Sequence, residues 1–264
     1  MKNDFSIDTT WDIETGPLPL EDLQRICDPF KPEDPPGEFD PSTVKIPGNW
    51  GAEAVQKKIE AERLKHVEKI ASYQGDCEQA EAAYWKKIVD NAAKSAETGF
   101  VCAVGIRDVV GGELALIHCG PTEDPLEKEP EILRETWDYL SPEMNPGNKV
   151  GHNIYGFDLP FLVRRSIIRG VPVPQGLIKD CRYWHPSYHD TMVAWRMGVH
   201  GYFIKLGVLA QLLGVGAKSD DCTGAKFYYK FVGTPKERAT ALRYLANDLD
   251  MTYLVAKKIY GTAD

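Results

Sequence analysis

The stretch that decides the fold reads Trp-Asp-Ile-Glu-Thr-Gly over residues 11–16, close to the N-terminus. Its two carboxylates, Asp12 and Glu14, are two positions apart, so in a β-strand both side chains point to the same face of the sheet. Two neighbouring carboxylates repel each other, and a shared proton or a bound divalent cation usually relieves that repulsion. Acid pairs are also common on solvated strand edges. The function of this pair therefore depends on the groups that the rest of the chain brings to it.

The composition is that of a soluble globular protein. The chain has 264 residues, of which 43% are hydrophobic and 27% charged, enough for one large domain or one domain with an insertion. No apolar run is long enough to span a membrane, and the N-terminus lacks the apolar core of a secretion signal. We therefore expect a cytoplasmic protein that does not interact with membranes.

The charge is unevenly distributed along the chain. The net charge is −8, which argues against a protein that coats nucleic acid generally. Residues 159–247 contain 13 Lys and Arg against 5 Asp and Glu, a local balance of +8, so the remainder carries −16. This basic segment could face a polyanion, or it could simply be an uneven solvated surface.

The cysteines are scattered and include no C-x-x-C pair, which predicts reduced and mostly buried thiols. They are Cys27, Cys77, Cys102, Cys119, Cys181 and Cys222. A zinc site at Cys181, His185 and His189 is an alternative, but Pro186 interrupts the segment and no fourth ligand is evident. We interpret the two histidines as loop residues and Asp190 as a helix cap or turn residue.

The hydrophobic pattern predicts alternating helices and strands around an insertion. Proline-rich turns fill most of residues 16–50, with a short helical turn at 21–27, and a helical region follows at 52–96, with a break at Gly75 and Asp76. The insertion, about residues 32–98, is expected to pack on the core or to serve as a docking surface. Strands are predicted at residues 99–106, 113–119 and 149–153, an element at 188–197, and helices at 130–140, 158–168, 205–214 and 235–260. Residues 215–224 are predicted as a loop.

Further acids lie at the start of one predicted helix and inside another. Asp158 follows Phe157 at the helix start, where a carboxylate is also a common cap. Tyr244 and Asp248 are four residues apart and share one face of the last helix, whereas Asp250 points away. Taken alone, each could be an ordinary structural residue.

Four carboxylates converging on one spot could hold two divalent cations roughly 3.5–4 Å apart, the arrangement used for phosphodiester chemistry. Carboxylate oxygens are hard ligands that suit Mg²⁺ or Mn²⁺.

At this point the sequence resembles the DEDD superfamily of 3′–5′ exonucleases, which has a ribonuclease-H-like fold. Asp-Ile-Glu-Thr at residues 12–15 matches the first motif, and the N-x-x-x-F-D pattern at residues 153–158 matches the second as it occurs in family B polymerase proofreading domains. The Y-x-x-x-D pattern at residues 244–248 matches the third motif of the tyrosine-bearing branch; the other branch has a histidine where Arg243 stands here. The region after residue 205 is similar to stand-alone exonucleases of bacteria and phages. Residues 32–98 lie outside the resemblance.

The resemblance implies an α/β fold, a mixed sheet flanked by helices with a helical insertion after the first strand, forming a single exonuclease domain over residues 1–264. It implies two divalent cations, Mg²⁺ or Mn²⁺, and a catalytic tyrosine, Tyr244, that orients the attacking water. The implied metal ligands are Asp12, Glu14, Asp158 and Asp248, and the implied neighbours of the terminal nucleotide are Thr15, Asn153 and Phe157. Phe157 could equally be a core residue.

The activity implied is removal of nucleoside 5′-monophosphates from the 3′ end of single-stranded or frayed DNA. A polymerase or another replication or repair protein is the implied partner. A 3′–5′ exoribonuclease of the same superfamily is the alternative within this class. A catalytically inactive nucleic-acid-binding scaffold is the alternative outside it, and would be expected to have lost an acid or the tyrosine.

Overall fold

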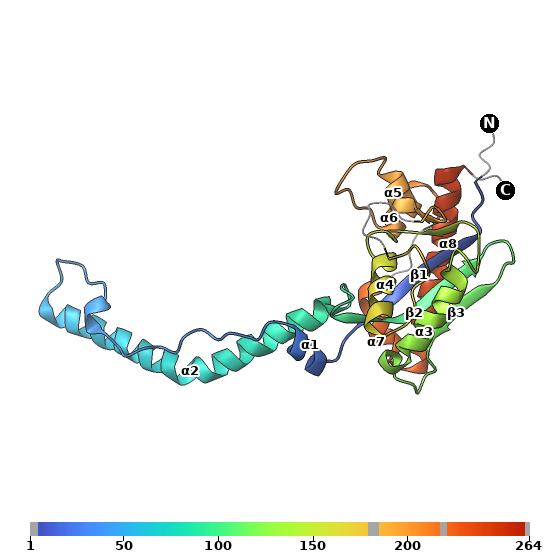
Figure 1. Cartoon of the computed structure of the whole chain (residues 1–264). Coiled ribbons are helices and arrows are strands. Elements are labelled where there is room, and N and C mark those ends of the chain that lie inside the picture. Colours follow the sequence, from blue (N-terminus) through green and yellow to red (C-terminus); the bar gives the residue numbers. More distant parts are fainter. Residues whose placement is uncertain (1–4, 179–184, 217–220, 262–264) are drawn as a thin grey trace. The chain divides into compact units, whose positions relative to one another are not determined.

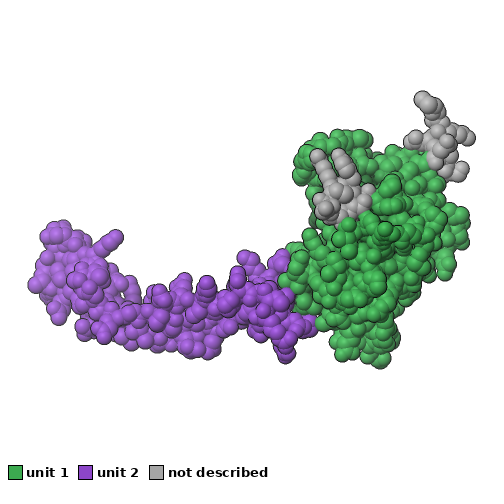
Figure 2. Space-filling view, in the orientation of Figure 1, with its two compact units in different colours: residues 1–18, 92–264 green, residues 19–91 purple. Residues whose placement is uncertain are grey.

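The structure, a computed structural model, describes residues 5–178, 185–216 and 221–261. The chain divides into two compact units, which Figure 2 colours separately: Met1–Leu18 together with Ala92–Asp264, and Pro19–Asn91. The second unit begins at Pro19, earlier than the predicted start of the insertion near residue 32. It ends at Asn91, a few residues before the predicted end near residue 98. Each unit is described by itself below.

The first unit is built on a mixed five-stranded sheet of order β3-β2-β1-β4-β5. Figure 1 labels β1, β2 and β3 of this sheet. The strands are β1 (Thr9–Pro17), β2 (Gly99–Asp108), β3 (Leu114–His118), β4 (Lys149–Gly151) and β5 (Tyr188–Asp190). The central strand β1 runs antiparallel to β2 and parallel to β4, and β4 runs parallel to β5. A mixed sheet with flanking helices confirms the predicted α/β class and is consistent with a ribonuclease-H-like fold.

Helices cover both faces of this sheet. The side chains of β2 point into two cores, one on each face of the sheet. A β-bulge opposite Glu14 and Thr15 interrupts their alternation, so Cys102 and Ala103 lie in the same core. Val101 and Val104 pack with α3 (Pro125–Leu140) and α4 (Asp158–Ile168). Phe100 and Cys102 pack with α7 (Gly224–Phe231) and α8 (Pro235–Tyr260). A third core joins α8 to α5 (Thr191–Trp195) and α6 (Leu206–Leu212).

The last helix, α8, has the bounds that the sequence pattern predicts. Thr234 and Glu237 form a capping box at its start, each side chain bonded to the other residue's backbone N–H. Gly261 ends it with a left-handed φ of 65°, a conformation that glycine adopts at little cost. The bounds of α4 are confirmed as well, and α1 (Leu20–Ile26) replaces the predicted helical turn.

Two predictions about the helices are wrong, and one helix was not predicted. The break at Gly75 and Asp76 is absent: α2 (Ala52–Ala92) runs through both residues. One glycine in an exposed helix costs only about 1 kcal/mol relative to alanine, and the good helix formers on both sides offset it. Helix α3 starts at Pro125 rather than at residue 130, because Asp124 caps it by accepting the Leu126 N–H. Helix α7 was not predicted and begins at the end of the expected loop.

In the second unit, the proline-rich segment runs along α2. The Tyr73 and Tyr84 hydroxyls donate to the carbonyl oxygens of Glu33 and Asp28, respectively. These bonds hold an irregular segment that has few backbone hydrogen bonds of its own. A short 3-10 helix, Pro41–Thr43, follows.

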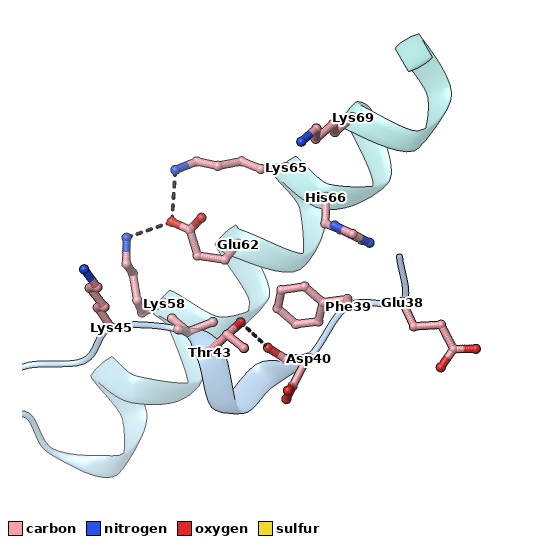
Figure 3. A pocket seen from close by; sticks show the side chains of 11 residues that line it. Glu38, Phe39, Asp40, Thr43, Lys45, Lys58, Glu62, Lys65, His66 and Lys69 are labelled. Carbon is pink, nitrogen blue, oxygen red and sulfur yellow. Dashed lines mark hydrogen bonds and ion pairs between the residues drawn. The ribbon is translucent and has the colours of Figure 1, made fainter. Parts of the chain in front are cut away.

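An open cavity of about 600 Å³ lies between this segment and α2 (Figure 3). On its helix side, Lys58 and Lys65 both donate to Glu62, at 2.8 and 3.0 Å. None of the residues implicated in catalysis by the sequence lines this cavity.

The five described cysteines carry free thiols, and Cys102, Cys119 and Cys222 are buried, as predicted. Cys181 lies outside the described residues. Among the described helices, none combines the length and apolar character needed to cross a membrane.

Candidate active site

The two acids of the first motif lie on the central strand and face α8. Asp12 is paired with Gly105 of β2, and Glu14 with Ala103. Paired residues of antiparallel strands have their side chains on the same face. Gly105 has no side chain, and a β-carbon added to it would lie only 2.9 Å from Leu245 Cγ of α8. Helix α8 therefore packs directly on this face of the sheet. Glu14 is only 6% exposed, and Asp12 is half-buried.

Asp158 meets the same strand from α4. Strand β4 is short and ends at Gly151, so it pairs only with Thr9 and Thr10 of β1. Beyond that pairing, the Ile13 N–H of β1 donates to Asp158 Oδ1 at 3.2 Å. The Asp158 side chain also forms a hydrogen bond with that of Asp12. The first and second motifs, far apart in sequence, are therefore in direct contact.

The pKa of Asp158 is raised to about 7. Burial is the main cause, the hydrogen bonds from Ile13 and Asp12 oppose the rise, and the negative charge of Asp190 adds a small part to it. An ionised carboxylate can only accept hydrogen bonds, so the bond between Asp12 and Asp158 requires a proton on one of them. A cation would supply the same neutralising charge.

Tyr244 and Asp248 bring the third motif to these acids. Their side chains are hydrogen-bonded to each other, one turn apart on α8, and Asp248 is 4% exposed. Asp250 is more than half exposed and pairs with Arg107 Nε at 2.7 Å. The prediction that Asp250 points away from the site is confirmed.

The pKa of Tyr244 lies well above its ordinary value. Burial is the main cause, and the negative charges of Asp248, Glu14 and Asp12 add to it. The electrostatic influence of Glu14 and Asp12 on this hydroxyl means that both strand acids lie near α8. Tyr244 therefore stays protonated, and its hydroxyl can orient a neighbour by hydrogen bonding but cannot act as a strong base.

Helix α7, which was not predicted, also borders the site. A Cβ on Gly224 would lie 4.0 Å from Glu14 Oε2, and the Phe227 ring lies 6.5 Å from that of Tyr244. Thr223 as a possible cap, followed by Phe227 and Phe231 one turn apart, was the available signal. An eight-residue helix is too short for its periodicity to stand out.

The three residues predicted to contact a nucleotide have structural partners. The Thr15 hydroxyl donates to the Ala93 carbonyl oxygen at 2.7 Å. Asn153 adopts a left-handed φ of 67°. Its side-chain oxygen lies so close to Gly156 that a β-carbon added there would be 2.5 Å from it. The half-buried Phe157 ring packs 5.3 Å from that of Phe161. Their role toward a nucleotide stays a prediction.

Asp190 organises the loop that carries the second motif. Its carboxylate accepts the backbone N–H of Asn153 and Tyr155, both at 3.0 Å. It also caps α5 by accepting the N–H of Met192 and Val193. The prediction of a cap is confirmed, but the bonds to the 153–155 loop could not be read from the sequence.

Asp190→Ala is expected to destabilise the first unit by about 2–4 kcal/mol, since it removes a helix cap and leaves two loop N–H groups without their charged acceptor. Denaturant unfolding measures the change. Asp108→Ala is the matched control, because Asp108 accepts the N–H of Val110 and Gly111 in an exposed turn. An equal loss of stability in both variants would contradict the assignment.

The alternative zinc site gains no support from its described members. His189 Nε2 lies 3.0 Å from Asn148 Oδ1, and His185 Nδ1 accepts the Ser187 N–H. Cys181 lies outside the described residues. Within residues 5–178, 185–216 and 221–261, no group of three or more His, Cys, Asp or Glu forms a metal-binding cluster as it stands. In the acidic site, Asp12, Asp158 and Asp248 are engaged in the hydrogen bonds described above.

The sequence matches no protein-family model and no curated protein. Among solved structures, it is similar to the family B DNA polymerase from the hyperthermophilic archaeon Pyrobaculum calidifontis. The TM-score is 0.50 and the sequence identity 23%; the match covers 64% of this chain and 23% of the polymerase chain. At this identity the likeness establishes the fold alone. The match spans about a quarter of the polymerase's length.

Proposed function

We propose that this protein is a metal-dependent 3′–5′ exonuclease that hydrolyses phosphodiester bonds at the 3′ end of single-stranded or frayed DNA. The observation that supports this most strongly is the contact between three separated motifs. Asp158 is bonded to Asp12 and to the Ile13 N–H, and Tyr244 is bonded to Asp248 under the electrostatic influence of Glu14 and Asp12. The similarity to a DNA polymerase chain favours DNA over RNA.

Asp12, Glu14, Asp158 and Asp248 are the residues that would hold two divalent cations. Their oxygen donors suit Mg²⁺ or Mn²⁺. Burial raises the pKa of Asp158 by disfavouring its charged form, and a bound cation would offset that cost. Cations held there would supply a lower pKa for a bound water molecule and positive charge beside the phosphate.

The remaining residues act by positioning. The protonated Tyr244 hydroxyl orients the attacking water by hydrogen bonding. Asp190 keeps the 153–155 loop in place, and the burial of Glu14 and Asp248 keeps bulk water away from the carboxylates. Products are nucleoside 5′-monophosphates, released one at a time.

The test is incubation with 5′-labelled single-stranded DNA in Mg²⁺ or Mn²⁺. We expect a ladder that shortens from the 3′ end and is absent in EDTA. Faster degradation of RNA of the same sequence would favour the exoribonuclease alternative. Binding without cleavage of DNA, RNA or mismatched duplex would favour the inactive scaffold.

Tyr244→Phe is expected to lower kcat by about 10–100-fold, since one hydrogen bond to an ionised group is worth about 1.5–3 kcal/mol. Single-turnover cleavage of single-stranded DNA measures the effect. Tyr253→Phe, on the same helix and half-buried, should leave kcat unchanged. Equal rates for Tyr244→Phe and the wild type would contradict the orienting role.

Partners and cellular location stay predictions. A polymerase or another replication or repair protein is the proposed partner. A cytoplasmic location would agree with DNA or RNA as the substrate.

A further inference from the structure

An exposed apolar surface lies on residues 196–205, which join α5 to α6 (Figure 1) and are named here the 196–205 loop. Its most exposed large side chains are Met197, Val199, Tyr202 and Phe203. Phe203 is 61% exposed and Tyr202 44%. Four large exposed apolar side chains within seven residues are a feature that interaction sites share.

The charge of this region differs from that of the rest of the chain. Residues 191–216 contain no Asp or Glu, although the chain has 39 of them among 264 residues. The loop contributes Arg196, His200 and Lys205, and the last two are exposed. A cationic surface on a protein of net charge −8 complements an anionic partner.

The backbone holds the loop out from the core. Met197 has a left-handed φ of 48°, which non-glycine residues rarely adopt, and Gly198 and Gly201 have φ values of 85° and 72°. At its C-terminal end, Ile204 and Leu206 are buried in the core that α6 forms with α8. Before its N-terminal end, Met192 of α5 is buried in the same core, so both ends of the loop adjoin buried residues while Met197, Val199, Tyr202 and Phe203 between them are exposed.

The loop is also tied to the acidic site. The two ring nitrogens of His152 lie 2.8 Å from Thr191 Oγ1 and from the Ile204 carbonyl oxygen. His152 immediately precedes Asn153 in the loop that leads to Asp158. One side chain therefore links the 196–205 loop to the segment carrying the second motif.

We infer that the 196–205 loop binds the single strand that leads to the acidic site, an inference that rests on the proposed function. Unpaired bases stack on Tyr202 and Phe203, and Arg196 and Lys205 contact the phosphates. Aromatic side chains combined with cations are the features that bind single strands without sequence preference. Bases of a duplex are already stacked on each other, so the loop selects unpaired strands.

The test is a Tyr202→Ala/Phe203→Ala variant, with Val110→Ala/Met144→Ala as the matched control because both control side chains are exposed in other loops. The probe is a fluorescent oligothymidylate of about 16 nucleotides in EDTA. We expect binding about 10-fold weaker or more for the loop variant and unchanged for the control. On the same oligonucleotide in Mn²⁺, KM should rise by a similar factor while kcat stays constant.

Hydrolysis of thymidine 5′-p-nitrophenyl phosphate separates this inference from the proposed function, because this substrate is a single nucleotide with no adjoining strand for the loop to bind. The loop variant should hydrolyse it at the wild-type rate. Wild-type cleavage of DNA with no change in binding or KM in the loop variant would overturn the inference alone. Binding that depends on Tyr202 and Phe203 without any cleavage would overturn the proposed function alone. Absence of oligonucleotide binding by the wild type, or equally tight binding of blunt duplex, would also overturn the inference.

The positively charged side chains of the loop, Arg196 and Lys205, are tested by the salt dependence of binding. Arg196→Gln/Lys205→Gln should reduce the dependence of log K on log salt by about 1.4, since each phosphate contact to a single strand contributes about 0.7. An unchanged slope would contradict phosphate contacts at these two residues.

Discussion

Asp248→Asn is expected to reduce cleavage of single-stranded DNA by about 10³-fold or more. The substitution keeps the size of the side chain and its ability to accept a hydrogen bond from Tyr244, but it removes one of four proposed cation-binding carboxylates. Losing one preorganised donor already costs an enzyme about 10²–10³-fold, and a charged cation ligand is worth at least as much. The measurement is the single-turnover rate at saturating Mn²⁺.

The same helix supplies the matched control. Asp250→Asn removes a carboxylate two residues away that is more than half exposed and pairs with Arg107. It should retain nearly the full rate, because exposed ion pairs contribute little to stability and this one does not face the acids. Equal losses in both variants, or full activity of Asp248→Asn, would contradict the assignment of the site.

Glu129→Gln is expected to destabilise the first unit by about 3–5 kcal/mol, because it leaves the Arg165 guanidinium buried without its counter-charge. Glu129 is fully buried, and Arg165 donates to its two oxygens at 2.8 and 2.6 Å. Glu129 also accepts the Val101 N–H of β2 at 2.9 Å, so the carboxylate joins α3, α4 and the sheet. The melting temperature should fall by about 6–20 °C.

Glu131→Gln is the control for this prediction. Glu131 is on the same helix, largely exposed, and pairs with Lys128 at 2.9 Å. Its substitution should leave the melting temperature unchanged within error, since exposed pairs are screened by solvent. A shift in Glu129→Gln no larger than that in Glu131→Gln would contradict a structural role for the buried pair.

The sequence predicted the elements that carry strong local patterns. β1 was recognisable from its apolar and acidic alternation, and α4 and α8 from long helical stripes with clear start signals. Because Asp12, Glu14, Asp158, Tyr244 and Asp248 all lie on these elements, the candidate site could be assembled before the structure was known.

What could not be predicted depends on contacts made only after folding. Asp190 accepts the backbone N–H groups of Asn153 and Tyr155, more than 30 residues away in the sequence. Every residue except proline has such a backbone group, so the sequence does not indicate which ones Asp190 will bind. The Glu129–Arg165 pair was missed because Glu129 fell outside the predicted helix. Pro130 looked like a helix start, whereas the helix begins at Pro125 and Pro130 lies inside it.

The length of an element also limited the prediction. Helix α7 is too short to show periodicity, whereas in α2 the local signal of Gly75 and Asp76 was outweighed by many helix-favouring neighbours.

The measurement that tests the central claim most directly is anomalous diffraction at the manganese edge from crystals soaked in MnCl₂ and thymidine 5′-monophosphate. The account predicts two peaks, roughly 3.5–4 Å apart, among the carboxylates of Asp12, Glu14, Asp158 and Asp248. Peaks only elsewhere, such as beside His185 and His189, or no ordered manganese at these four acids, would contradict it.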